Sequence, residues 1–423
     1  MKRFFAFALA LLLAFFAVSC AMPEEEKVPE ETEKPKTVYE IVGTIIGKNS
    51  YYDSDVTDDD IAKALIDAYI ASTGDRHARY YNEEEFLALQ GSSTGETVGI
   101  GVVVIENPEY KCIEVIGVVP DTPADVAGVQ AGDLIVRIGN GDDAEDISKL
   151  SYEVARTKLA GEAGTLCDFG VVRDGNFDEI IEFSVTREKY TYDSVMLEVC
   201  EADPSIGIVK IRKFNYTTPA QFKNVINTLS EKGCTRFVFD LRNNVGGSLD
   251  AVETMISYFA NPGDILFRRK DRNGNMTTNY CEVRTYGGER ADCSVAEEEM
   301  GMYRELENIV VMNEYTASAA ELFAAALSDY ELTTTVGVQT YGKGTTQTVY
   351  DLSNYGDYKG GIKLTTRFYY PPTSDNYDGV GITPDVIVEP DEVMKTYNTY
   401  KLLLPEYQKY DNQLAAAVEI LQK

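Results

Sequence analysis

One serine lies where an apolar strand meets a helix, a position from which its hydroxyl can act as a nucleophile. Ser318 follows the apolar run Ile309–Met312 and opens an Ala-rich stretch, Ala317–Leu327, that is predicted to be helical. The helix dipole favours a negative charge that develops at such an N-terminus. A serine in this place more often only caps the helix. Ser318 is therefore a candidate nucleophile that still needs a base.

A lysine between two glycines is the candidate base. Lys343 follows the expected strand Thr334–Val338, within the run T-Y-G-K-G-T-T-Q (340–347). Burial disfavours the ammonium form, so a buried lysine becomes neutral and can take a proton from a serine hydroxyl. The alternatives are a solvated turn residue or a phosphate loop, but G-K-G-T lacks the spaced leading glycine of a P-loop. The pattern favours the Ser-Lys variant of the Ser-His-Asp triad.

A glycine-rich turn supplies a third candidate element. The expected strand Arg236–Leu241 runs into R-N-N-V-G-G (242–247). Paired glycines permit a close approach of the backbone, whose N–H groups can then point at an oxyanion. The same residues are also compatible with a simple tight turn between a strand and a helix.

Composition excludes several other kinds of function. The 423 residues include 39 Lys+Arg and 69 Asp+Glu, a net charge of −30, which is unsuitable for binding nucleic acid. His77 is the single histidine, so no metal site with two imidazoles is possible, and no metal or cofactor is expected. After Cys20, six cysteines remain without a CxxC spacing. Cys281 and Cys293 are compatible either with a disulfide or with free thiols.

The N-terminus resembles an export signal. Lys2 and Arg3 precede an apolar run of about 15 residues, too short for an ordinary membrane span. We expect a signal peptide at 1–19, followed at 20–37 by a lipidated Cys20 and an acidic tether that cannot bury enough surface to fold. The alternative is an ordinary cleaved signal with Cys20 as an incidental thiol.

The rest of the chain divides by pattern into three regions. Residues 38–94 are predicted to be a small helical region, and 95–188 show short β runs between Gly, Pro and Asp turns. Residues 189–423 alternate strands with helices, which predicts parallel pairing. The fold class is therefore α/β, a core of strands alternating with helices in a mixed sheet, with an inserted, mostly-β module. The hairpin runs expected in the core are Thr345–Leu352 and Gly361–Tyr369, and its last helix is Gln413–Leu421.

Four blocks of this sequence resemble the signature of the carboxy-terminal processing (tail-specific) serine proteases. In chain order they are D-L-R-N-N-V-G-G (240–247), N-E-Y-T-A-S-A-A-E (313–321), T-Y-G-K-G-T-T-Q (340–347) and G-V-G-I-T-P-D-V (379–386). The resemblance extends over about residues 38–421. That family carries an inserted PDZ domain, and T-P-A-D-V-A-G-V-Q-A-G-D-L-I (122–135) is similar to its central motif.

The resemblance implies a role for each matching residue. Ser318 corresponds to the nucleophile, Lys343 to the general base and Gln347 to the residue that orients the lysine, while the N–H groups of Gly246 and Ala319 correspond to the oxyanion hole. Two positions depart from the family pattern, because Val245 replaces a usual Pro and Ala320 a common Ser. We interpret Glu321 as a structural or positioning carboxylate, and His77 as a structural residue distant from the dyad.

The glycine turn at the start of the module resembles the PDZ loop that binds a peptide carboxylate. Gly99, Ile100 and Gly101 would supply the N–H groups, and the strand that follows would offer its edge to the peptide. A plain glycine turn is the alternative.

Together these features predict an exported serine endopeptidase, a lipoprotein on the outer face of the bacterial cytoplasmic membrane. Its substrates would be proteins or peptides with free C-termini, cleaved through an acyl-enzyme. The rival hypothesis is a non-catalytic PDZ lipoprotein that binds peptides. A nucleotide-dependent enzyme is disfavoured by the spacing of G-K-G-T. Substrate identity and oligomeric state are not predicted.

Overall fold

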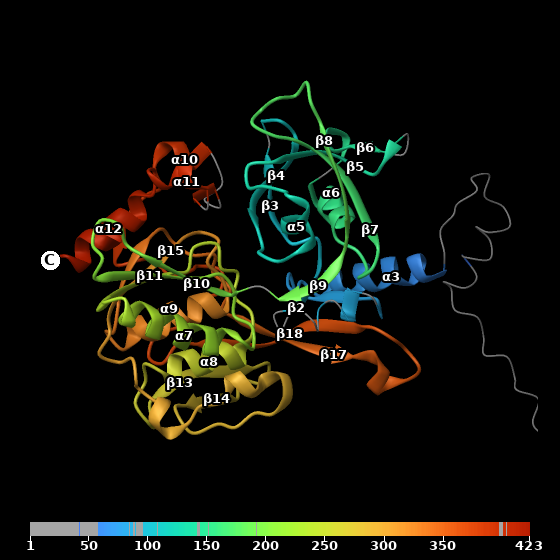
Figure 1. Ribbon diagram of the computed structural model, residues 1–423. Helices are drawn as coiled ribbons and strands as arrows, with labels where there is room; N and C mark the ends of the chain where they lie inside the picture. Colours follow the sequence, from blue (N-terminus) through green and yellow to red (C-terminus); the bar gives the residue numbers. More distant parts are fainter. Residues whose placement is uncertain are drawn as a thin grey trace, which may run out of the picture. The chain divides into compact units, whose positions relative to one another are not determined.

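The computed structural model describes residues 42, 58–83, 85–87, 89, 96–107, 109–141, 144–150, 152–191, 193–396, 401–402 and 404–423 (Figure 1). The chain divides into two compact units, Met1–Ala62 and Lys63–Lys423, and nearly all described residues belong to the second. The predicted signal peptide, Cys20 and the tether lie outside the described residues. Within the described ranges, no helix combines the length and apolar character needed to span a membrane.

A six-stranded mixed sheet forms the centre of the core and confirms the predicted α/β class. All neighbouring strands pair in parallel except the edge strand β10, which is antiparallel to β11. The order across the sheet is β10 (Val195–Val199), β11 (Ile206–Ile211), β12 (Arg236–Asp240), β15 (Glu307–Met312), β16 (Thr334–Gly337) and β19 (Val386–Ile387). The carboxyl ends of the parallel strands therefore share one edge, where the predicted catalytic segments begin.

Alternating apolar residues bury both faces of this sheet. One face packs on α7 (Thr218–Glu231), α8 (Leu249–Ser257) and α9 (Ala319–Asp329), which gather on one side of the sheet in Figure 1. Phe237 and Phe239 point to that face, whereas Val238 between them points to α12 (Asn412–Leu421) on the other. Successive side chains of a strand point to opposite faces of the sheet, so β12 contributes residues to the apolar clusters on both faces.

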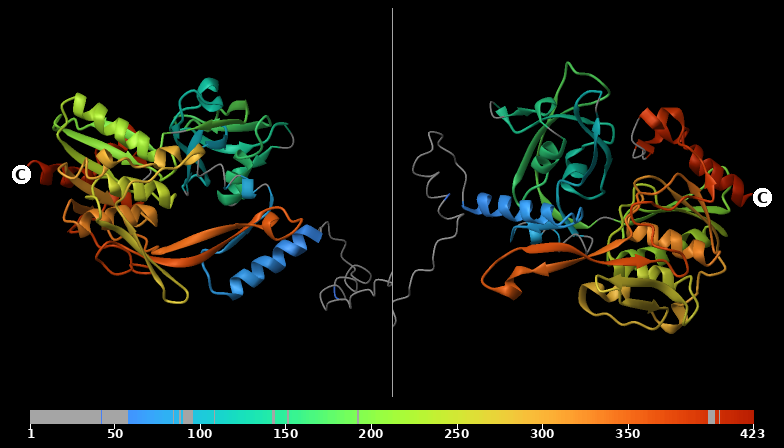
Figure 2. Two further views of the ribbon diagram at one scale, coloured as in Figure 1. Left: turned by 90° about the horizontal axis from the view of Figure 1, so that it is seen from below. Right: turned by 180° about the vertical axis from the view of Figure 1, so that it is seen from behind.

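A second, five-stranded antiparallel sheet was only partly predicted. The expected hairpin is confirmed as β17 (Thr345–Asp351) and β18 (Gly361–Tyr370), and it extends away from the core in both views of Figure 2. β18 also pairs with β1 (Arg79–Tyr81) and β13 (Ile265–Asp271), and β13 pairs with β14 (Met276–Tyr280). The region expected to be helical thus contributes β1 to the core, because β18 offers it a free edge.

The inserted module is a separate, mostly antiparallel sheet with its own apolar cluster. Its strands are β3 (Val102–Asn107), β4 (Cys112–Val118), β5 (Leu134–Ile138), β7 (Leu166–Val172) and β8 (Ile181–Thr186), with β6 (Glu145–Asp146) beside β5. Its helices are α5 (Pro123–Ala127) and α6 (Tyr152–Leu159). β2 (Glu96–Gly99), which enters the module, pairs antiparallel with β9 (Glu188–Thr191), which leaves it. With this pair of strands the module spans residues 96–191, whereas its predicted bounds are 95–188.

The remaining helices lie near the two ends of the described chain. They are α3 (Asp58–Ser72), α10 (Glu392–Thr396) and α11 (Pro405–Gln408). Short 3₁₀ turns occur at Ile147–Lys149, Gly288–Cys293, Glu297–Glu299 and Leu352–Tyr355. Cys281 and Cys293, for which a disulfide was one possibility, are free buried thiols here.

Candidate active site

Ser318 lies at the N-cap of α9 in a conformation that non-glycine residues rarely adopt. Its backbone has φ 60° and ψ −120°, and its side chain is half-buried. Such a conformation costs about 1–3 kcal/mol and persists only where surrounding contacts hold it. One of these contacts is the Ser318 N–H, which donates to Glu321 Oε2 at 2.8 Å. The serine is thus presented by a strained turn rather than by a regular cap.

The carboxylate of Glu321 joins the serine segment to the lysine segment. Besides the N–H of Ser318, it accepts the N–H of Gly342 at 2.7 Å, the N–H of Lys343 at 2.8 Å and the hydroxyl of Thr340 at 2.5 Å. Glu321 is fully buried, and burial raises its pKa although these four donors oppose the shift. The interpretation of Glu321 as a positioning carboxylate agrees with these contacts.

The surroundings of Lys343 favour its neutral amine. Burial lowers the pKa of Lys343, and the positive charge of Lys363 lowers it further. The carboxylates of Glu321 and Asp378 oppose this shift without reversing it. An amine that loses its proton more readily than an ordinary lysine is better suited to act as a base.

Gly246 packs directly against the serine. A Cβ at Gly246 would lie 2.7 Å from Ser318 Cβ and 2.8 Å from the backbone nitrogen of Ala319, so only glycine fits there. Its φ of 95° also suits glycine alone. The N–H of Gly246 donates to Asn244 Oδ1 at 2.9 Å. For a substrate oxyanion to accept this N–H, the bond to Asn244 must break or be shared.

The loop that carries Gly246 (residues 242–247, here called the oxyanion loop) is held at several points. Asn244 Nδ2 donates to the carbonyl of Ile211 at 2.8 Å, and the Asn244 carbonyl accepts the N–H of Ala317 at 2.9 Å. Asn243 and Asn313 exchange two hydrogen bonds of 2.9 Å. Val245, where the family usually has Pro, is 62% exposed. The loop is therefore fixed by polar side chains rather than by a proline.

Gln347 makes contacts other than the predicted one to Lys343. On β17, its Nε2 donates to the hydroxyls of Thr345 at 3.1 Å and Thr365 at 3.3 Å. Thr365 in turn donates through its N–H and hydroxyl to Asp75. Gln347 thus bonds within the hairpin, Thr365 joins the hairpin to the turn that follows α3, and the orienting role of Gln347 stays a prediction.

The turn at residues 74–78 lies next to the loop that carries Lys343. This corrects the expectation that His77 is distant from the dyad. Asp75 Oδ1 accepts the N–H of His77 at 3.0 Å, and Arg76 pairs with Asp378 at 3.4 Å. Asp378 also accepts the N–H of Gly344. Burial lowers the pKa of His77, and the charge of Lys343 lowers it further, so the two side chains interact electrostatically. Sequence spacing hides this proximity because the segments are more than 260 positions apart.

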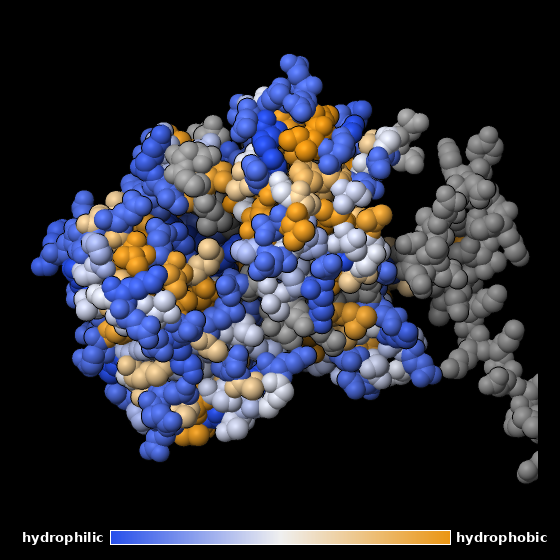
Figure 3. Space-filling view, viewed as in Figure 1, coloured by the Kyte–Doolittle hydropathy of each residue, from blue (hydrophilic) through white to orange (hydrophobic). Residues whose placement is uncertain are grey.

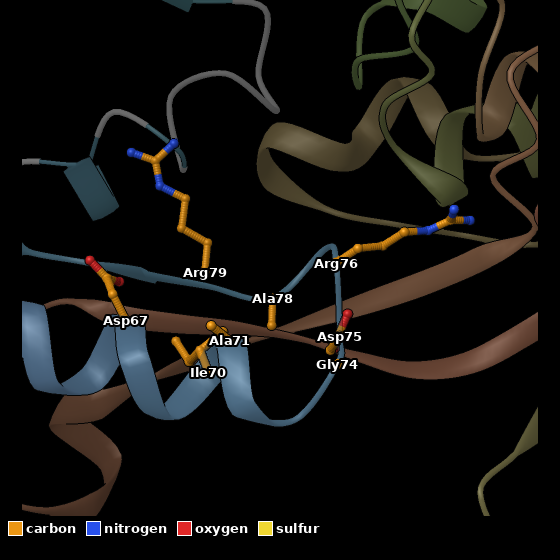
Figure 4. A pocket seen from close by; sticks show the side chains of 8 residues that line it. All are labelled: Asp67, Ile70, Ala71, Gly74, Asp75, Arg76, Ala78 and Arg79. Carbon is orange, nitrogen blue, oxygen red and sulfur yellow. The ribbon is translucent and has the colours of Figure 1, made fainter.

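A pocket of about 370 Å³ opens beside the same turn and does not include the serine or the lysine. It is lined by the end of α3 and the residues that follow, from Asp67 to Arg79. Figure 4 shows Asp75 and Arg76 on the turn after α3. His77 Nε2 is buried and has no hydrogen-bond partner in the described part of the chain.

Two tyrosines complete the surroundings of the serine and were not predicted. The hydroxyl of Tyr369 donates to the Lys343 carbonyl at 2.5 Å and also interacts with the side chain of Ser318. The Tyr377 hydroxyl donates to the Ser318 carbonyl at 3.5 Å. Both rings are buried, and burial raises the pKa of each. Local sequence does not indicate these contacts, because Tyr369 ends the predicted run Gly361–Tyr369, Tyr377 lies in a loop, and both are distant from Ser318 along the chain.

The predicted carboxylate turn of the module is buried and tightly packed. The carbonyls of Ile100 and Gly101 accept the N–H groups of Ala124 and Val119, both at 2.8 Å. A Cβ at Gly101 would lie 1.9 Å from the hydroxyl of Thr122, so this position requires glycine. Gly99, the third predicted residue, ends β2. These contacts anchor the turn to the T-P-A-D segment at the start of α5.

The described residues contain no group of His, Cys, Asp or Glu side chains arranged to hold a metal ion. The thiols of Cys112, Cys167, Cys234, Cys281 and Cys293 have raised pKa values, chiefly because they are buried. Such thiols are poor nucleophiles, which leaves Ser318 as the better candidate.

Comparison with known proteins assigns this chain to a family. A model described as Peptidase family S41 matches residues 205–388, and a PDZ domain model matches residues 87–167. The carboxy-terminal-processing protease of Bartonella bacilliformis is 31% identical over 336 residues, which cover 78% of this chain and 70% of that protein. The carboxy-terminal processing protease CtpA of Bacillus subtilis is 28% identical over 360 residues, 84% of this chain and 70% of that protein.

A solved structure has the same fold. The putative S41 protease of Bacteroides fragilis superposes with a TM-score of 0.55 at 15% identity, covering 92% of this chain and 98% of that one. The family match covers the strand ends that carry Gly246, Ser318 and Lys343. The chain therefore belongs to the carboxy-terminal processing proteases, serine-type peptidases of family S41 with a PDZ domain.

Proposed function

We propose that this protein is a serine endopeptidase with a Ser318–Lys343 dyad that selects substrates by their C-terminal tails. The observation that carries the proposal is the shared carboxylate of Glu321, which binds the N–H groups of both dyad residues. A buried four-donor contact of this kind holds the two segments in one relative position. The close packing of Gly246 on Ser318 supports the same assignment.

In the proposed reaction, the neutral amine of Lys343 accepts the proton of the Ser318 hydroxyl as the oxygen attacks a peptide carbonyl. The carbonyl oxygen becomes an oxyanion, which accepts the N–H groups of Gly246 and Ala319. The C–N bond then breaks, and the departing amine takes the proton from Lys343. Water hydrolyses the resulting acyl-enzyme, with Lys343 again acting as the base. Gln347 would orient Lys343 after a shift from its present partners.

The PDZ domain is proposed to hold the substrate tail. β3 is an edge strand of its sheet, so it can add a peptide strand through backbone hydrogen bonds. The turn at Gly99, Ile100 and Gly101 precedes β3 and would receive the terminal carboxylate. The relatives are named carboxy-terminal processing proteases, which supports this part of the proposal.

We also propose that the protein is exported and lipidated on Cys20, so that it stays on the outer face of the cytoplasmic membrane. The basic start, the short apolar run and the acidic segment after Cys20 support this location. The membrane and the substrate tail would then be its two partners.

The central experiment combines a serine-reactive probe with peptide hydrolysis. We expect the wild type to be labelled on Ser318 and to cleave peptides, and Ser318→Ala to do neither. Ser328→Ala, on the same helix and partly exposed, is the matched control and should behave like the wild type. An unlabelled, inactive wild type that still binds peptides would instead support the rival hypothesis of a non-catalytic PDZ lipoprotein.

Recognition of the tail is tested with one peptide in two forms. Hydrogen bonds to a charged group contribute about 1.5–3 kcal/mol, so amidating the C-terminus should lower kcat/KM by roughly 10- to 100-fold. The measurement compares cleavage of the free-acid and amidated peptides by the same enzyme. Equal cleavage would show that the terminus is not recognised.

A further inference from the structure

The segment between α10 and α12 contacts the PDZ domain through a buried ion pair. Lys401 Nζ lies 3.0 Å from Glu114 Oε2 on β4, and each side chain is 7% exposed. Asn107, at the end of β3, donates to the same oxygen at 2.7 Å. Removing one member of a buried pair is strongly destabilising because the other charge stays buried without a partner. This pair therefore attaches Lys401 to the PDZ sheet.

An apolar contact beside the ion pair fixes the segment to β3 itself. Leu404 packs with Ile105 of β3 and Ile116 of β4, and all three are at most 5% exposed. The alternate residues of β3, Val102 and Val104, face the main PDZ cluster on the other side of the sheet. The segment therefore covers the outer face of the strand whose free edge is proposed to bind the substrate tail.

The other end of this segment reaches the oxyanion loop. Asp411, the N-cap of α12, binds Arg242 through two hydrogen bonds of 2.6 and 2.8 Å, and Arg242 also binds Asp240. Arg242 is 5% exposed and is the first residue of the oxyanion loop. Burial opposes the charge of Asp411, but Arg242 still holds the pKa of Asp411 below its ordinary value. The loop is therefore tied at its base to residue 411.

The Arg242–Asp411 contact is close in sequence to Gly246, the proposed oxyanion donor. Gly246 follows Arg242 by four positions, and its N–H is bound to Asn244 Oδ1. Because the packed, hydrogen-bonded loop has little freedom, a shift of Arg242 is expected to move Asn244 and release or hold that N–H.

We infer that residues 401–402 and 404–413, here called the strap, transmit tail binding at the PDZ domain to the oxyanion loop, with Asp411 as the positioning residue. The inference rests on the proposed function and adds its regulation. A tail that pairs with β3 alters the strand beneath Leu404, and the strap carries that change to Arg242. Because the Gly246 N–H is engaged by Asn244, the expected effect of tail binding is activation.

The first test measures activation in trans. The reporter is an amidated, internally quenched peptide, and the effector is a pool of free-acid decapeptides with apolar last residues. Couplings between sites are typically about 5- to 150-fold, so the pool should raise wild-type kcat by at least about fivefold. The same pool in amidated form should have no effect, since it lacks the carboxylate.

The decisive variant is Glu114→Gln with Lys401→Gln. It removes both charges together, leaves no unpaired buried ion, and keeps a carbonyl that can accept from Asn107. We expect it to retain its basal rate and lose the activation. The matched control, Glu392→Gln with Lys395→Gln, removes a more exposed ion pair on α10 and should be activated like the wild type.

Asp411→Asn tests the catalytic end of the strap. Misplaced oxyanion donors weaken binding of the transition state only, so kcat should fall while KM changes little. Each kcat is divided by the number of probe-labelled serines. A purely structural role would reduce the labelled fraction and leave kcat per labelled site unchanged. Hydrogen exchange of residues 241–248 should respond to the free-acid pool in the wild type and not in the double variant.

The outcomes separate this inference from the proposed function. If the wild type is labelled and cleaves the reporter, but the pool activates the double variant equally or activates neither enzyme, the strap does not couple the sites and the peptidase stands. If the wild type is neither labelled nor active, the proposed function and the inference both fall.

Discussion

At the scale of single residues, the proposed chemistry depends on the charge of Lys343. A serine hydroxyl is a weak nucleophile until a base removes its proton, and the single histidine is not required for that role if the lysine is neutral. Burial and Lys363 lower the pKa of Lys343, while Glu321 and Asp378 raise it. Burial and Lys363 dominate, so the pKa of Lys343 is lowered, as the proposed role of this lysine as a base requires.

We expect Lys343→Arg and Lys343→Ala to lose activity to a similar extent while both remain folded. Arginine keeps the positive charge but stays protonated at any working pH, so it cannot accept the serine proton. Removing one member of a cooperating nucleophile–base pair typically costs several orders of magnitude in rate. The measurement is peptide hydrolysis, with folding checked by circular dichroism.

His77→Ala is the control for this series. His77 contacts Asp75 through its backbone N–H, which alanine retains, so much of the activity should remain. A folded but inactive His77→Ala enzyme, or an active Lys343→Arg enzyme, would overturn the assignment of the base.

The charge of Lys363, which lowers the pKa of Lys343, should affect the pH dependence of the activity. A nearby positive charge disfavours the ammonium form, so Lys363→Gln should raise the pKa of Lys343. If Lys343 is the base, kcat/KM follows its neutral fraction, and the rising limb of the pH profile should move to higher pH. The profile is measured beside that of Lys359→Gln, an exposed lysine paired with Glu83, which should be unchanged. A shift to lower pH in Lys363→Gln would contradict the assignment.

At the scale of elements, one carboxylate holds the start of α9 against the loop after β16. Glu321 is on the first turn of α9, and three of its four donors come from residues 340–343. Those residues follow β16 at the carboxyl edge of the sheet, the edge at which the oxyanion loop follows β12. The site is therefore assembled by contacts between the ends of neighbouring strands, as expected for an open α/β sheet.

Glu321→Ala should destabilise the fold as well as the site. It would leave three buried N–H groups and a hydroxyl without their acceptor, and an unsatisfied buried polar group costs about 1–3 kcal/mol. We expect the free energy of unfolding to fall by roughly 3 kcal/mol or more, measured as a lower urea midpoint at an unchanged slope.

Glu314→Ala is the matched control for that measurement. Glu314 is exposed and lies on the loop just before the helix, and such surface changes stay within about 0.5 kcal/mol. If both variants had the same midpoint, Glu321 would not hold the two segments together.

At the scale of the whole molecule, the net negative charge limits how the protein could be attached to a membrane. The net charge of −30 opposes adsorption to anionic lipid, so attachment to a membrane would need a hydrocarbon anchor. Figure 3 shows hydrophilic residues over much of the visible face, with apolar patches scattered between them. The proposed anchor at Cys20 and the acidic segment after it would keep such a surface near the membrane without direct adsorption.

Cys20→Ser should release the protein into the medium. Stable anchoring requires two lipid chains or an equivalent second signal, and the substitution removes the thiol to which lipid would be attached. The measurement is the distribution between membrane and medium, together with the mass of the mature N-terminus. A fully soluble wild type without added lipid mass would end the proposal.

The sequence alone was sufficient for most elements and for the dyad candidates. β12, β17 and β18 begin at their predicted residues and end within one residue of their predicted ends, because each run is limited by turn residues whose effects are local. Ser318 and Lys343 could be proposed from their immediate neighbours, a strand end, a helix start and two glycines. Such signals need only a few consecutive residues.

Only the tertiary structure decided which distant segments meet. β1, β13 and β18 share one sheet although they are separated by at least 90 positions along the chain, and no local pattern selects a strand's partner. The same holds for His77 beside Lys343, for Tyr369 at the serine, and for Asp411 on Arg242. These contacts depend on how all elements pack together, since a side chain's neighbours across the core are set by the fold and not by its position in the sequence.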